Sequence, residues 1–171
     1  WLITTCLAEV AVSAIVRGFE NTLAQAVALA SFMPLIAAMG GNVGAQSSTL
    51  CVRGLATGHI QPSQWKKMAE RELRAGIYMG MGYGVAVGGA AAVIYWGRFG
   101  AAFPIVVGLG VLFSMTVAST MGAVEPFLLH RLKMDPAVAV GPLVSTMTDL
   151  LSVTAYLSLA TLALSQGWMS R

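Results

Sequence analysis

The sequence predicts an all-α integral membrane protein with five transmembrane helices. Of its 171 residues, 57% are hydrophobic and only 10% are charged, and the mean hydropathy is +0.75. A soluble domain carries about 25% charged residues. The apolar residues also run in long blocks rather than in short periodic stripes, so we expect them to face lipid and not one buried core.

Five apolar segments reach or approach the length of about 20 residues that a spanning helix needs. They cover residues 1–16, 22–54, 75–97, 102–129 and 137–166. We interpret residues 1–171 as a single transmembrane domain. Its first segment lacks the basic start and the cleavage site of a signal peptide, so we expect a real span that belongs to a longer protein.

The basic residues predict the orientation of these spans. Seven of the ten Lys and Arg residues lie in or beside the second and fourth connections: Arg53, Lys66, Lys67, Arg71, Arg74, Arg131 and Lys133. Because cytoplasmic loops are enriched in Lys and Arg, we place these connections and the N-terminus inside and the C-terminus outside. This distribution also argues against nucleic-acid binding.

Within the second connection, residues 59–73 form either a short interfacial helix, with Trp65 at headgroup level, or a solvated connector.

Small residues recur at four-residue spacing in the third and fourth spans. They are Gly76, Gly80, Gly84 and Gly88 in the third span and Ser114, Ala118 and Gly122 in the fourth. Small residues on one face let two membrane helices approach closely, so we interpret both series as packing surfaces.

The last span carries an acidic residue deep in its apolar region. Asp149 follows Ala137 by twelve residues, or about 18 Å along a helix. A carboxylate there costs about 3 kcal/mol or more on insertion scales, so it should face a partner or water. Its face is shared by residues that supply hydroxyl groups, Ser145, Thr146 and Ser152, and by Pro142, which frees a backbone carbonyl. We interpret this stripe as pore lining; the alternative is an uncharged acid in a helix–helix hydrogen bond.

The second span turns polar in its second half. The amide and hydroxyl side chains on one face there are Asn42, Gln46 and Thr49. The glycines at positions 40, 41 and 44 permit close backbone approach or a break in the helix. Polar groups at membrane depth are tolerated only beside protein or a water-filled cavity. We therefore expect this face to line the same pathway as Asp149.

Enzymatic chemistry has the least support. The two cysteines have neither CxxC spacing nor nearby histidines, and His59 and His130 have no metal-ligand partner at i+4. No nucleophile, base and orienting group occur together, so we expect no enzyme. Glu9 and Glu125 lie within predicted spans and have no role from sequence alone.

Six motifs occur in a specific order along the chain. They are GFE at 18–20, FMPLIAAMGGNVGAQSSTL at 32–50, RGLA at 53–56, PFLLHRL at 126–132, DPA at 135–137 and GPLVSTMTDLL at 141–151. Together they resemble the transmembrane domain of MgtE-type magnesium channels. The resemblance implies a multi-pass protein of the bacterial inner membrane that forms a homodimer, with a pore along the twofold axis lined by the second and fifth helices. Members of this family usually carry cytoplasmic sensing domains as well, which we expect in the full-length protein and not in this chain.

The resemblance also implies specific site residues. The pore aspartate of the family corresponds to Asp149, and the backbone carbonyl that helps to hold the ion corresponds to Ser145. Asp135 corresponds to the acidic residue near the cytoplasmic gate, and Asn42 lies in the motif that faces the pore. The implied function is passive conduction of hydrated Mg²⁺, and of any other divalent cation that the pore admits.

Two other functions remain open. A secondary exchanger would couple Mg²⁺ to Na⁺ or H⁺ and could use Glu125 or Glu9 as its coupling site. A membrane-anchoring or assembly module would carry no ions.

Overall fold

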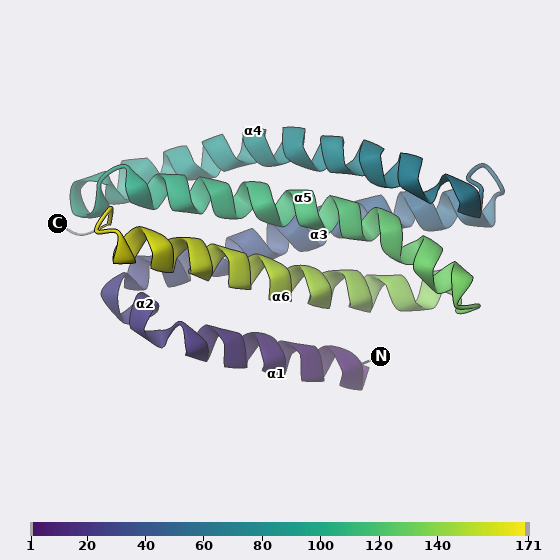
Figure 1. Cartoon of the computed structure of the whole chain (residues 1–171), viewed down its shortest axis with the longest axis horizontal. Coiled ribbons are helices and arrows are strands. Elements are labelled where there is room, and N and C mark those ends of the chain that lie inside the picture. Colours follow the sequence, from purple (N-terminus) through teal and green to yellow (C-terminus); the bar gives the residue numbers. More distant parts are fainter. Residues whose placement is uncertain (1, 170–171) are drawn as a thin grey trace.

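The computed structural model describes residues 2–169, apart from the side chains of residues 137–140, and every regular element in this part is helical (Figure 1). The elements are α1 (Leu2–Gly18), α2 (Glu20–Gln25), the 3₁₀ helix η1 (Val27–Ser31), α3 (Met33–Ala56), the 3₁₀ helix η2 (Pro62–Gln64), α4 (Trp65–Phe99), α5 (Ala102–Arg131) and α6 (Pro136–Ser165). The predicted all-α class is therefore confirmed.

In this part of the chain, four helical segments are long and apolar enough to cross a bilayer. They are Val27–Ala56, Pro62–Phe99, Ala102–Arg131 and Gly141–Ser165. The α1 helix is apolar too, but its 17 residues make it shorter than these four. The chain is thus an integral membrane protein with four such helices, and a fifth span formed by α1 stays a prediction.

The long helices lie side by side and alternate in direction (Figure 1). Both connections that carry most of the basic residues, between α3 and α4 and between α5 and α6, lie at the same end of the bundle (Figure 1). This arrangement is the one that the charge pattern requires. Which end faces the cytoplasm remains a prediction.

Two element boundaries differ from the sequence-based expectation. The helix expected over 22–54 is divided into α2, η1 and α3, and the chain leaves helical geometry at Ala26 (φ −139°, ψ 72°). By contrast, α3 is continuous through Gly40 and Gly41. In addition, α4 already begins at Trp65, so most of the expected interfacial segment is its first part.

The α4 and α5 helices pack through the predicted glycine face. All four glycines of the series are buried: Gly76, Gly80, Gly84 and Gly88. A Cβ atom on Gly84 would lie 2.7 Å from the Gly108 carbonyl oxygen, and one on Gly80 would lie 2.9 Å from that of Leu112. Real Cβ atoms essentially never come this close to backbone, so the interpretation as a packing surface is confirmed.

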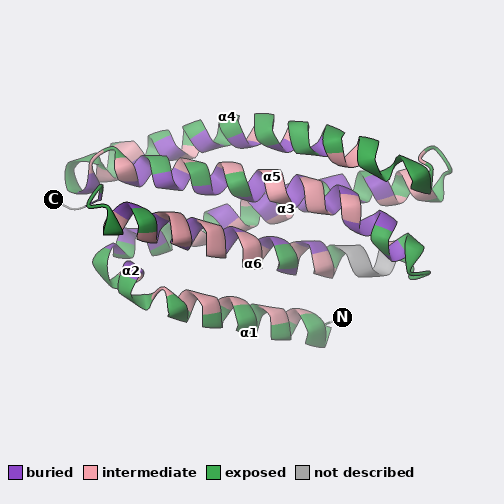
Figure 2. Ribbon diagram, viewed as in Figure 1, coloured by how far each residue is buried: buried purple, intermediate pink, exposed green. Residues whose placement is uncertain are grey.

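The α5 helix lies at the centre of the bundle and packs against α3, α4 and α6. The face of α5 that carries Ser114 and Gly122 meets α3. The Ser114 hydroxyl donates to the Ile36 carbonyl at 2.9 Å, and Gly122 lies against the Gly44 backbone. Burial follows this arrangement, since α5 is largely buried whereas α1 and the outer face of α4 are exposed (Figure 2). That outer face carries large apolar side chains, among them Val85 and Val93, as expected for contact with lipid.

The start of α3 is held by contacts outside its own helix. The ring of Phe32 packs edge-on against Phe103 of α5, with 5.7 Å between the ring centroids. In η1, the carbonyl of Leu29 accepts a hydrogen bond of 3.1 Å from the buried Tyr156 hydroxyl of α6. These contacts fix the position of α3 relative to α5 and α6.

Candidate ion pathway

One face of α3 is polar and exposed. Asn42, Gln46 and Thr49 line a shallow groove of about 610 Å³ together with Ala45 and Leu50. All five residues belong to α3, which confirms that the three polar side chains share a face. No other element of the described chain covers this groove.

The opposite face of α3 is locked into the bundle by two glycines. A Cβ atom on Gly44 would lie 2.6 Å from Cγ1 of Val144 and 3.2 Å from the Ala118 carbonyl oxygen. A Cβ atom on Gly40 would collide with the Ser114 hydroxyl and would lie 2.8 Å from Cγ2 of Thr148. The glycines therefore provide close approach rather than a break, and they turn the polar face away from α5.

These contacts also set the depth of Asn42 relative to α6. Gly40 is level with Thr148, and Gly44 is level with Val144. Asn42 lies midway between the two glycines, so its height along the bundle falls within about one helical turn, 5.4 Å, of Ser145 and Asp149. The structure thus brings three of the four predicted site residues to one level.

Asp149 is half-buried on α6, and its side chain forms no hydrogen bond or salt bridge with any described residue. Its charged neighbour is Glu9 of α1, which is close enough to act on it electrostatically. The α1 helix packs along α6, and this packing brings the two acids near each other. The proximity of Glu9 to Asp149 was not predicted, because nothing local in a sequence shows which helices become neighbours.

The hydroxyl groups around Asp149 divide into two sets. Those of Ser145 and Thr146 donate to carbonyls of their own helix, at 3.1 Å from Ser145 to Gly141 and at 2.9 Å from Thr146 to Pro142. Ser152 is fully buried and donates instead to the Ser114 hydroxyl of α5 at 2.9 Å. Ser152 therefore joins α6 to α5 and is not exposed to a pathway beside Asp149.

Asp135 lies apart from the other three residues. It is exposed and directly precedes Pro136, the first residue of α6. Fourteen positions separate it from Asp149, or about 21 Å along a helix. Any role of Asp135 therefore belongs to the end of the helix bundle.

A buried acid that the sequence analysis missed lies between α3, α4 and α5. The Glu72 carboxylate accepts hydrogen bonds from Ser47 of α3 at 2.7 Å and from Ser119 of α5 at 3.2 Å. Ser119 also lies 2.8 Å from the Glu72 carbonyl. Glu72 precedes Gly76 by four residues, so it continues the buried glycine face by one more step. That spacing was the signal that could have identified it.

Glu125 is a second buried acid, on α5. One of its carboxylate oxygens, Oε2, is buried without a hydrogen-bond partner. Position 125 follows Gly122 by three residues, which places it in phase with the face of α5 that meets α3.

No group of three or more His, Cys, Asp or Glu side chains capable of holding a metal ion occurs among the described residues. The polar side chains at the depth of Asp149 carry amide and hydroxyl groups, and Glu9 is the acidic residue that acts on Asp149 electrostatically.

Comparison with known proteins identifies relatives of this chain. The MgtE family model, described as a divalent cation transporter, matches residues 33–159, which is most of the chain. A magnesium transporter MgtE of Thermus thermophilus is 36% identical over 164 residues, covering 96% of this chain and 36% of that protein. One of Bacillus subtilis is 35% identical over 161 residues, covering 94% of this chain and 35% of that protein. The chain thus spans about a third of the length of these relatives, and it belongs to the MgtE family of divalent cation transporters.

Proposed function

We propose that this chain forms a passive, magnesium-selective channel, in which hydrated Mg²⁺ crosses the membrane between two copies of the chain. In this proposal, α3 and α6 of both copies line the pore and α1 is the fifth span. The observation that carries the proposal is the common depth of Asn42, Ser145 and Asp149 on two membrane helices. The relatives in Thermus and Bacillus are named as magnesium transporters.

The requirement for a second copy follows from the polar face of α3. Asn42, Gln46 and Thr49 are exposed in one copy, although they lie on a membrane-spanning segment. Polar side chains at that depth need protein or water beside them. A twofold axis along this face would supply both, and in this proposal the two Asp149 side chains lie at the same depth on either side of that axis.

The residues at this level suit the chemistry of Mg²⁺. The ion prefers oxygen ligands in an octahedron and gives up its water reluctantly. Two Asp149 carboxylates, with the Ser145 carbonyl and the Asn42 amide, would hold the ion through its water shell. Asp135, at the end of the bundle that we assign to the cytoplasm, would raise the local cation concentration at that mouth.

Uptake of Mg²⁺ into proteoliposomes, without a sodium or proton gradient, tests the proposal. The Asp149→Asn variant keeps the shape of the side chain but removes its charge, so we expect at least a tenfold loss of uptake. Glu70→Gln is the matched control, since Glu70 is an exposed acid at the start of α4 that pairs with Arg74 of the same helix. Full uptake by Asp149→Asn would contradict the assignment of the ion site.

An exchanger is the second candidate, and one observation favours it. A buried carboxylate oxygen without a partner, as at Glu125, suits a group that binds and releases a proton or Na⁺. Uptake that begins only when a gradient is imposed, and that Glu125→Gln abolishes, would support the exchanger. The relatives are about three times as long as this chain, so we place regulatory domains in the rest of the full-length protein.

A further inference from the structure

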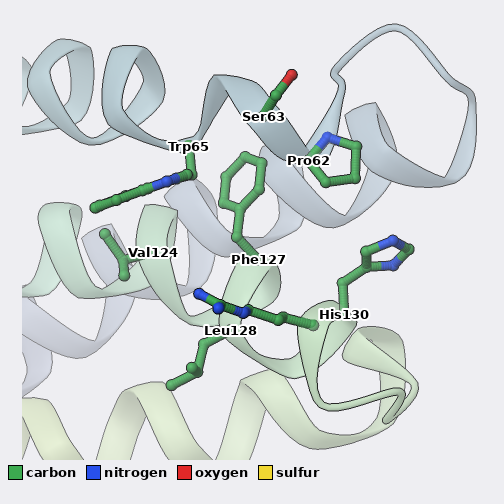
Figure 3. A pocket seen from close by; sticks show the side chains of 8 residues that line it. Pro62, Ser63, Trp65, Val124, Phe127, Leu128 and His130 are labelled. Carbon is green, nitrogen blue, oxygen red and sulfur yellow. The ribbon is translucent and has the colours of Figure 1, made fainter.

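A groove of about 540 Å³ lies at one end of the bundle, between the start of α4 and the end of α5 (Figure 3). Its apolar wall consists of Pro62, Trp65, Val124, Phe127 and Leu128. Figure 3 shows the Phe127 ring directed toward the segment that carries Pro62 and Trp65. A volume of this size lies within the range of about 300–1,000 Å³ that is typical of small-molecule sites.

The position of the groove limits what can occupy it. Pro62 begins one candidate membrane span, and Arg131 ends another. The groove therefore lies at the end of the bundle where these two helices leave the bilayer. An occupant must be apolar on one side and polar on the other, and Trp65 is the residue type enriched at this level.

The rim of the groove carries the positive charge of Arg131. Arg131 and His130 line it, and the Lys66 amine lies 5.6 Å from the centre of the Trp65 ring. No acidic residue is among the lining residues, and the described part of the chain contains no salt bridge to Arg131. A second copy docked symmetrically on this groove would set the same cations against each other, so charge argues against that occupant.

We propose that this groove is a binding site for an anionic phospholipid. One acyl chain packs against Phe127 and Leu128, and the phosphate group pairs with Arg131. A guanidinium group suits this role because its planar donors match the geometry of phosphate oxygens. The site lies at the end of the bundle that we assign to the cytoplasmic leaflet, where basic segments attract anionic lipids.

Trp65 provides a local reporter of occupancy. The protein is reconstituted in nanodiscs that contain either brominated phosphatidylglycerol or brominated phosphatidylcholine, since bromine on the acyl chain quenches a nearby indole. Subtracting the emission of the Trp65→Phe variant isolates the signal of Trp65 from those of the other tryptophans. We expect half-maximal quenching at an at least fivefold lower mole fraction of the anionic lipid than of the neutral one.

Two charge variants test the recognition itself. Arg131→Gln should reduce the preference for phosphatidylglycerol about fivefold, the effect expected for one basic residue near an anionic surface. Arg98→Gln removes the same charge at the other end of α4 and should leave the preference unchanged. Equal quenching by both lipids in the parent protein would overturn the proposal, and so would a preference that survives Arg131→Gln. Absence of quenching by either lipid would also overturn it, because a protein segment would then fill the groove.

Discussion

The buried Glu72 carboxylate illustrates how single residues hold this bundle together. Two serine hydroxyls reach it from α3 and α5, Ser47 at 2.7 Å and Ser119 at 3.2 Å, and the two hydroxyls lie 3.3 Å apart. Glu72 is only 7% exposed. A buried carboxylate is costly without hydrogen bonds, so this cluster joins three helices through a single side chain.

Replacement of Ser47 by alanine should therefore destabilise the bundle. The variant loses the shortest hydrogen bond to Glu72, and we expect a loss of about 1–2 kcal/mol in the free energy of unfolding. Thermal unfolding in detergent, followed by circular dichroism, measures the effect. Ser165→Ala is the control, because the exposed Ser165 hydroxyl donates only to a carbonyl of its own helix. Equal melting temperatures for the two variants would show that the cluster contributes no stability.

At the scale of helices, the contact between α4 and α5 depends on the absence of side chains. A methyl group on Gly84 would meet the Gly108 backbone, whereas one on Gly82 would meet nothing within 4 Å. Gly84→Ala should thus force the two helices apart and cost about 1–3 kcal/mol, as overpacking does in other cores. Gly82→Ala should leave stability unchanged or raise it slightly, because alanine is the better helix former. Urea unfolding of the two variants in the same detergent compares them, and similar losses for both would refute the packing argument.

The helices could be predicted because their signals are local. Apolar runs marked the membrane segments, and four-residue spacing marked the glycine face of α4. The break at Ala26 carried no such mark, since residues 22–31 contain neither glycine nor proline. It coincides with long-range contacts, those of Leu29 with Tyr156 and of Phe32 with Phe103. The two residues of each contact lie far apart in the sequence, so no local pattern encodes the contact.

The candidate site could be predicted only in part, for a related reason. Helical spacing placed Asn42 with Gln46, and the apolar context made Asp149 conspicuous. Spacing on one helix does not determine how that helix is rotated toward its neighbours, so it could not show that Ser152 is buried against α5. The proximity of Glu9 to Asp149 depends on how α1 docks onto α6, and no single segment contains that information.

For the whole molecule, the exposed surface has two different characters. The outer face of α4 is apolar, with Val85 77% exposed, and suits lipid. The exposed face of α3 carries Asn42, Gln46 and Thr49, and it points away from α5. In a bilayer the apolar face of α4 can contact lipid, whereas the polar face of α3 needs protein or water beside it. Any symmetric assembly that buries the polar face therefore leaves α4 on the outside.

Distances between spin labels on two copies test that assembly. Two variants are labelled separately, one at Gln46→Cys and one at Val85→Cys. In both variants Cys6 and Cys51 are replaced by alanine, so each copy carries one label. If the twofold axis runs beside α3, the distance between copies should be tens of ångströms shorter for position 46. The reason is that α5 separates α3 from α4, and each helix pair adds about 8–10 Å on both sides of the axis. Absence of dipolar coupling at position 46, or a shorter distance at position 85, would place the polar face away from any twofold axis. The pore between two copies would then have to be abandoned, whereas the packing of helices within each copy would stand unchanged.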